Sequence, residues 1–106
     1  MSDFQYVSQA ALGCAETLIP QWLPNGVREG KEWAAINPRR SDNTRGSFKV
    51  NLKTGAWADF SCGEKGGDCI SLYAYIFGVS QIEALKAIAN FLCIDLQNTS
   101  IHKPNV

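Results

Sequence analysis

Residues 47 to 60 carry the clearest structural pattern in the chain. From Ser47 to Leu52 the side chains alternate between apolar and polar, with Phe48, Val50 and Leu52 on one side, which is the pattern of a half-buried β-strand. Thr54-Gly55 then supplies a turn, and residues 56–60 return as the partner strand of a hairpin. The sequence therefore predicts an antiparallel sheet with this hairpin at its centre.

Before the hairpin, the sequence predicts one helix and one further strand. Asp3 can cap a helix whose apolar positions recur at steps of three and four, and Pro20 with the following Pro24-Asn25-Gly26 should end it. Its expected buried stripe consists of Phe4, Val7, Ala11, Cys14 and Leu18. Residues 31–36 form a candidate strand, which Asn37-Pro38 should terminate because proline cannot donate to a ladder.

After the hairpin, the sequence predicts two more helices. Asp68 is a plausible cap for an apolar helix over residues 69–77, in which Cys69 should be buried, and Gly78 should stop it. Ser80 and Glu83 have the spacing of a capping box. The last helix has an expected buried stripe of Ile82, Leu85, Ile88, Ala89 and Leu92, and Cys93 beyond it is also expected to be buried. The fold class is α+β, a small antiparallel sheet flanked by helices.

The length and the charge of the chain limit its organisation. With 106 residues it is expected to be a single module over residues 1–96, followed by a polar tail or linker start over 97–106, and too short to hold a polymerase or a helicase as well. Residues 28–65 contain eight bases and five acids, so this segment is +3 while the remainder is −3. No signal peptide or membrane-spanning run is visible, and we expect a reduced, cytoplasmic protein.

The basic segment contains the best candidates for contact with a nucleic-acid backbone. These are Arg39, Arg40, Arg45, Lys49 and Lys53, although a weak excess of charge can also be only a solvated face. Trp57 or Trp33 could stack on a base if one of them is exposed, and the alternative for each ring is a place in the core.

A glycine-rich loop precedes the helix over residues 69–77. Lys65 with Gly66 and Gly67 could hold a phosphate at the helix N-terminus. The alternative is that the glycines form a tight loop and Asp68 caps the helix. The loop is not a P-loop, because the required spacing and the Lys-Ser/Thr pair are missing.

The order of these motifs resembles that of the N-terminal zinc-binding domain of bacterial DNA primases. The resemblance covers about residues 28–93 and is carried by Asn37-Pro38-Arg39-Arg40, Gly46-Ser47-Phe48 and the run from Asp59 through Cys62-Gly63 to Asp68. It implies the same fold, with the sheet as the surface that faces nucleic acid. It also places Asn37, Arg40, Asp59 and Cys62 at the four positions where family members keep their zinc ligands.

Three of these four residues differ from the expected ligands, so the chain resembles a metal-free relative of the kind found in phage and plasmid primases. A structural zinc needs four thiolate, imidazole or carboxylate ligands, and only Cys62 and Asp59 are of such types here. We therefore expect no cofactor. The fold would then be held by Trp33, Phe48, Trp57 and Phe60 around the former metal position, with an ion pair or hydrogen bond between Asp59 and Arg40.

The resemblance implies a non-catalytic domain that binds single-stranded DNA template with a catalytic primase, polymerase or helicase module of a mobile element. No catalytic constellation is visible, and the only histidine, His102, lies in the tail. The Glu-Gly and later Asp-x-Asp signature of a primase catalytic domain is also missing. The alternative is a protein-binding adaptor or inhibitor of a replication enzyme, which the zero net charge fits better. A metal-dependent enzyme is the least supported interpretation.

Overall fold

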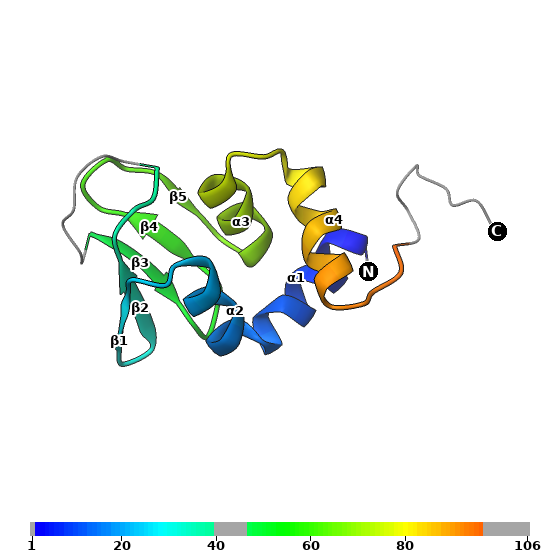
Figure 1. Cartoon of the computed structure of the whole chain (residues 1–106), viewed down its shortest axis with the longest axis horizontal. Coiled ribbons are helices and arrows are strands. Elements are labelled where there is room, and N and C mark those ends of the chain that lie inside the picture. Colours follow the sequence, from blue (N-terminus) through cyan, green and yellow to red (C-terminus); the bar gives the residue numbers. More distant parts are fainter. Residues whose placement is uncertain (1, 40–46, 97–106) are drawn as a thin grey trace.

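The computed structural model describes residues 2–39 and 47–96 and has the expected α+β architecture (Figure 1). Two helices precede a run of five short strands, and two helices follow it. In chain order the elements are α1 (Asp3–Gly13), α2 (Ala15–Trp22), β1 (Val27–Glu29), β2 (Glu32–Ala35), β3 (Phe48–Asn51), β4 (Trp57–Asp59), β5 (Lys65–Gly66), α3 (Cys69–Phe77) and α4 (Gln81–Phe91).

The sheet has the strand order β1-β2-β3-β4-β5, and each strand is antiparallel to its neighbours. The central hairpin β3–β4 confirms the sequence prediction, including the turn, where Gly55 has a φ of 82°. Strands β1 and β5 were not expected. They span only three and two residues, which is too short for an alternating pattern to be recognisable.

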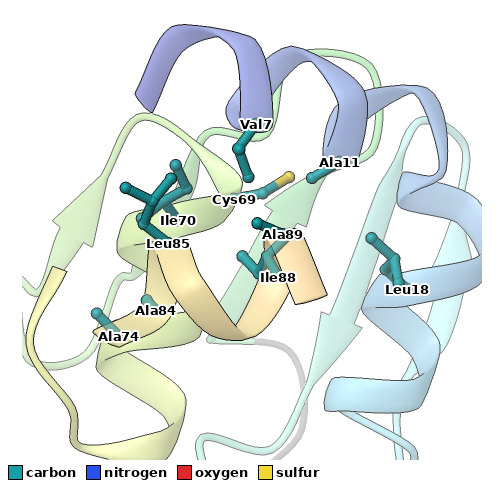
Figure 2. Packing of buried hydrophobic residues seen from close by; sticks show 10 residues of the cluster. All are labelled: Val7, Ala11, Leu18, Cys69, Ile70, Ala74, Ala84, Leu85, Ile88 and Ala89. Carbon is teal, nitrogen blue, oxygen red and sulfur yellow. The ribbon is translucent and has the colours of Figure 1, made fainter. Parts of the chain in front are cut away.

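The helices form two layers on one side of the sheet (Figure 1). Helix α3 is the central element, because Leu72 and Ile76 pack into a cluster with the sheet and α2, whereas Cys69 and Ile70 pack into a second cluster with α1 and α4. Figure 2 shows this second cluster, in which Val7 and Leu85 lie close to Ile70. A strongly apolar helix is expected in the interior, and five of the nine residues of α3 are buried between the two clusters.

The cluster against the sheet is rich in aromatic rings. Phe48 is fully buried and meets the Trp57 ring edge to face, with centroids 5.9 Å apart. Tyr75, on α3, stacks on Trp57 with centroids 4.9 Å apart. These contacts confirm Phe48 and Trp57 as core residues. Phe60, which we expected in the same core, is 72% exposed, so that prediction was wrong.

The N-terminal region differs from the prediction in four respects, the first being that Phe4, expected in the buried stripe, is 38% exposed. Ser2, not Asp3, is the N-cap of α1, and it forms a capping box with Gln5. The helix is interrupted at Cys14, which is exposed instead of buried, and restarts as α2. Pro20 lies inside α2 and does not end it. A proline removes one helical hydrogen bond, and burial of α2 against the core compensates for this loss.

The helix boundaries after the hairpin follow the sequence closely. The Asp68 side chain accepts a hydrogen bond from the Ser71 N–H at 2.7 Å, and Gly78 ends α3 with a φ of 68°. Ser80 and Glu83 form the expected capping box. Cys69 is buried as expected. Cys93 is exposed; it lies after the end of α4 and has a φ of 60°. Ile82, expected in the buried stripe, is 41% exposed.

Candidate nucleic-acid interface

The two faces of the sheet are separated by the strand register. Trp33, Val50 and Trp57 lie in one row, and the Trp57 indole N–H donates to Ser71 Oγ on α3 at 2.9 Å, so this row faces the helices. The next row, on the opposite face, consists of Val27, Ala34, Lys49, Ala58 and Lys65. We call this opposite face of the sheet the outer face.

Lys49 lies at the centre of the outer face between two acidic side chains. Its ammonium is 3.4 Å from a carboxylate oxygen of Glu29 and 4.0 Å from one of Glu32. All three side chains are partly exposed, so each ion pair is weak and sensitive to salt. The β1–β2 half of the outer face is therefore not a basic track, and Lys49 has to leave its carboxylate partners before it can bind a phosphate.

The β4–β5 half of the outer face has a different character. The Phe60 N–H donates to the Ser47 carbonyl at 2.8 Å, which continues the β3–β4 ladder by one residue and places the Phe60 ring on the same face as Ala58. Lys65 lies opposite Ala58 and is exposed. Phe60 and Lys65 thus both neighbour Ala58, one along the chain and one across the strands. An exposed aromatic ring and a nearby lysine together can stack on a base and contact its phosphate.

The sequence analysis wrongly placed Phe60 in the core because all the aromatic side chains of the hairpin were assumed to point inward. A signal was available in the sequence. In a strand that alternates, Trp57 and Asp59 share one face, and Phe60 must share the other with Ala58. The candidate aromatic residue on the outer face is therefore Phe60. Trp57 is 5% exposed, so the condition for its stacking on a base is not met.

The remaining basic candidates are dispersed. Arg39 is exposed, and its guanidinium lies against Gly78 at the end of α3, since a Cβ on that glycine would collide with it. Lys53 lies beyond β3 and lines a hollow at the α1–α2 junction, away from the outer face. Arg40 and Arg45 are outside the described residues. The alternation of the hairpin predicts Lys49 and Lys53 on one polar face, but the structure separates them: Lys49 is on the outer face, and Lys53 is at the α1–α2 junction.

The glycine-rich loop is explained by packing. Gly66 belongs to β5 and lies under the Trp57 ring, where a Cβ would collide with the indole nitrogen and with Ser71 Oγ. The Asp68 carboxylate itself occupies the N-terminus of α3. A Cβ on Gly67 would meet open space. These contacts account for Gly66 and Asp68 without a phosphate, and phosphate binding by the loop remains a prediction.

Two of the four positions that the resemblance assigns to zinc ligands, Asn37 and Asp59, form a buried hydrogen-bonded pair. Asn37 is 1% exposed and Asp59 is fully buried, and the Asn37 amide nitrogen donates to Asp59 Oδ2 at 2.7 Å. Cys62 is exposed, and in the described part of the chain no three side chains of ligand type lie close enough to hold a metal. The Asn37 amide oxygen, the atom that could face a metal, accepts from the Arg39 N–H at 2.8 Å and is not among the usual zinc ligands, and an arginine at position 40 stays protonated. The residues present therefore do not fit a zinc ion.

The fold is that of a primase zinc-binding domain. A crystal structure of the Aquifex aeolicus primase, with its zinc-binding and RNA polymerase domains, superimposes with a TM-score of 0.78 at 24% identity over 96% of this chain. The chain spans 24% of the length of that primase chain. No curated protein matches the sequence.

Residues 21–104 match the CHC2 zinc finger family, the zinc ribbon of DnaG-type primases, and the chain belongs to this family. The match includes the region over which the sequence resemblance was recognised. Among residues 2–39 and 47–96, no helix has the length and hydropathy needed to cross a bilayer.

Proposed function

We propose that this domain binds the single-stranded DNA template during primer synthesis and has no catalytic activity of its own. The observation that carries the proposal is the open Phe60 ring on the outer face of the sheet, two residues beyond Ala58, the cross-strand partner of Lys65. A stacking platform next to a cation is the common design of proteins that bind single strands without sequence preference. Membership of a primase domain family supports DNA as the ligand.

The domain would act with a catalytic primase, polymerase or helicase module, in the same chain or in a separate one. The Aquifex aeolicus primase supports this, since its zinc-binding domain is accompanied by an RNA polymerase domain. The replacement of ligands at Asn37 and Asp59 supports a phage or plasmid primase as the source, and all four cysteines are free thiols, as expected in the cytoplasm. The sequence has no Glu-Gly followed by an Asp-x-Asp, the signature of a primase catalytic domain, and this supports a non-catalytic role.

The proposal is tested by oligonucleotide binding with a matched pair of phenylalanine variants. Phe60→Ala should weaken binding of a fluorescent single-stranded oligonucleotide by about 5- to 150-fold, because one stacked base contributes about 1–3 kcal/mol. Phe91→Ala removes another exposed ring, 59% exposed and located on α4, outside the sheet, and should leave affinity unchanged. Equal affinities of the two variants would exclude Phe60 from the interface.

The charge contribution is tested by the salt dependence of the same titration. Lys65→Gln should reduce the slope of log affinity against log salt by about 0.7, which corresponds to one phosphate contact on a single strand. Lys86→Gln removes an exposed lysine on α4 and serves as the control. A wild-type protein that does not bind the oligonucleotide at low salt would contradict the proposal.

A second function, a protein-binding adaptor or inhibitor of a replication enzyme, is favoured by one observation. Glu29 and Glu32 make the β1–β2 half of the outer face acidic and neutralise Lys49. The net charge of the chain is also zero. This alternative expects no oligonucleotide binding at low salt, and capture of a primase, polymerase or helicase subunit that is lost when Glu29 and Glu32 are replaced.

A further inference from the structure

Asn37 and Asp59, at two of the positions that the resemblance assigns to zinc ligands, form short hydrogen bonds with each other and with neighbouring groups. The Asn37 amide nitrogen donates to Asp59 Oδ2 at 2.7 Å and contacts the Tyr75 hydroxyl at 2.9 Å, while Asn37 Oδ1 accepts from the Arg39 N–H at 2.8 Å. Asp59 Oδ1 accepts from the Ser61 N–H at 2.9 Å and from Ser61 Oγ at 2.7 Å. Both Asn37 and Asp59 are almost completely excluded from water.

The cluster joins three parts of the chain that are far apart in sequence. Asn37 lies just after β2, Asp59 ends β4, and Tyr75 lies on α3, with sequence separations of 22 between the first two and 38 between Asn37 and Tyr75. Burial of an amide and a carboxylate is costly unless they are hydrogen-bonded, and here the hydrogen bonds are made only if all three segments are in place. The cluster therefore couples the segment after β2 and the end of β4 to α3.

We propose that the Asn37–Asp59–Tyr75 cluster replaces the zinc ion as the cross-link of this domain, so that the fold is independent of metal. A structural zinc stabilises a fold by holding distant loops to one point. The same two positions do so here through side chains of opposite hydrogen-bonding character. Asn37 is the donor and Asp59 is the acceptor. The Tyr75 hydroxyl adds a hydrogen bond from α3, a helix that contains none of the four ligand positions.

The cluster also fixes the loop that bears the exposed aromatic ring. Asp59 binds the Ser61 N–H through its side chain, and its carbonyl accepts from the Cys62 and Gly63 N–H groups at 3.3 Å and 2.8 Å. Phe60 lies between Asp59 and Ser61, which this side-chain hydrogen bond holds together. The position of its ring on the outer face thus depends on a buried side-chain pair and not on a bound ion.

The proposal predicts rescue by exchange of the two residues. Asn37→Asp sets two carboxylates against each other, and Asp59→Asn leaves one oxygen for two donors, so that its NH2 faces either the Asn37 amide or the Ser61 N–H; each should lower the melting temperature by about 10 °C or more. The double variant Asn37→Asp with Asp59→Asn restores one donor and one acceptor and should recover at least half of that loss. Asn90→Asp, on the exposed surface of α4, is the control for the change of side chain and should melt within about 3 °C of the wild type.

Two further measurements keep the test decisive if a single variant does not fold. The wild-type protein should contain less than stoichiometric zinc by elemental analysis and should melt at the same temperature in excess chelator. Tyr75→Phe, which keeps the ring stacked on Trp57, should lower the melting temperature by about 5 °C. A double variant that is no more stable than either single variant, or one zinc per wild-type chain whose removal unfolds the protein, would overturn the proposal.

Discussion

At the scale of single residues, the four cysteines separate into one buried thiol and three exposed ones. Burial raises the pKa of the Cys69 thiol to about 11, and the Asp68 carboxylate adds to the shift. Because the thiolate is the reactive form, Cys69 is a packing residue and not a nucleophile. Cys14, Cys62 and Cys93 lie on the surface, where reagents reach them directly.

Thiol labelling checks this difference. At about pH 8 a thiol reagent should modify Cys14, Cys62 and Cys93 promptly and Cys69 only on unfolding. Since the thiol ionises with its ordinary pKa of 9.0 in the unfolded chain and with a pKa of about 11 in the folded one, the stability contributed by neutral Cys69 is complete below 9.0 and is lost as the pH rises through 11. The melting temperature of the wild type should therefore fall more between about pH 8 and pH 10.5 than that of Cys69→Ala. Equal falls would show that Cys69 ionises freely in the native state.

The second prediction at the residue scale concerns Phe48. Its ring is completely buried and contacts Trp57 and Tyr75, so Phe48→Ala should lower the free energy of unfolding by about 3–5 kcal/mol. Phe91→Ala, in which an exposed ring is removed, should change it by less than about 0.5 kcal/mol. Urea denaturation of both variants measures the difference. Similar effects of the two substitutions would contradict the core that we describe.

At the scale of elements, the outer face of the sheet is divided between its two ends. Strands β1 and β2 contribute Glu29 and Glu32, which surround Lys49 of β3. The ladder from β4 to β5 contributes Ala58 and Lys65, with Phe60 next to them. A single strand of DNA is thus expected along β4 and β5, with β1 and β2 repelling its phosphates.

Release of Lys49 tests this division. Glu29→Gln removes the nearer carboxylate partner of Lys49, and it should strengthen oligonucleotide binding at low salt and steepen the log–log salt slope by up to about 0.7. The matched control is Asp95→Asn, which removes an equal charge from an exposed position after α4 and should change neither quantity. Unchanged binding by Glu29→Gln, measured by the same fluorescence titration, would show that the carboxylates of β1 and β2 do not repel the nucleic acid.

At the scale of the whole molecule, α3 connects the two hydrophobic clusters. It contributes Leu72 and Ile76 to the cluster against the sheet, and Cys69 and Ile70 to the cluster with α1 and α4. Neither cluster is complete without this helix. The two halves of the domain should therefore not unfold separately.

Coincident unfolding curves are the test of this coupling. All three tryptophans, Trp22, Trp33 and Trp57, pack in or against the cluster between α2, α3 and the sheet, so their fluorescence reports mainly on that half, whereas far-ultraviolet circular dichroism reports mainly on the helices. Both signals should follow one transition with the same midpoint in urea. Helical signal that persists after the tryptophan signal is lost would show that α1, α3 and α4 are stable without the sheet.

The local sequence determined most of the elements and their ends. Alternation in residues 47–52 defines β3, and the caps at Asp68, Ser80 and Gly78 bound α3 and α4, because these signals depend only on residues within a few positions of one another. The family could also be recognised from motif order alone. Strands β1 and β5 were missed since such short segments become strands only through a neighbour that supplies their hydrogen bonds.

Contacts between distant residues decided the candidate site. The basic residues were selected as candidates for nucleic-acid contact because the segment that contains them has a positive charge. The carboxylate partners of Lys49, Glu29 and Glu32, come from two other strands, and only the register of the folded sheet brings them close to it. The Asn37–Asp59 hydrogen bond likewise joins residues 22 positions apart, and no local pattern in the sequence predicted it. Sequence patterns specify which side chains are near in the chain, whereas charge neutralisation and burial depend on which are near in space.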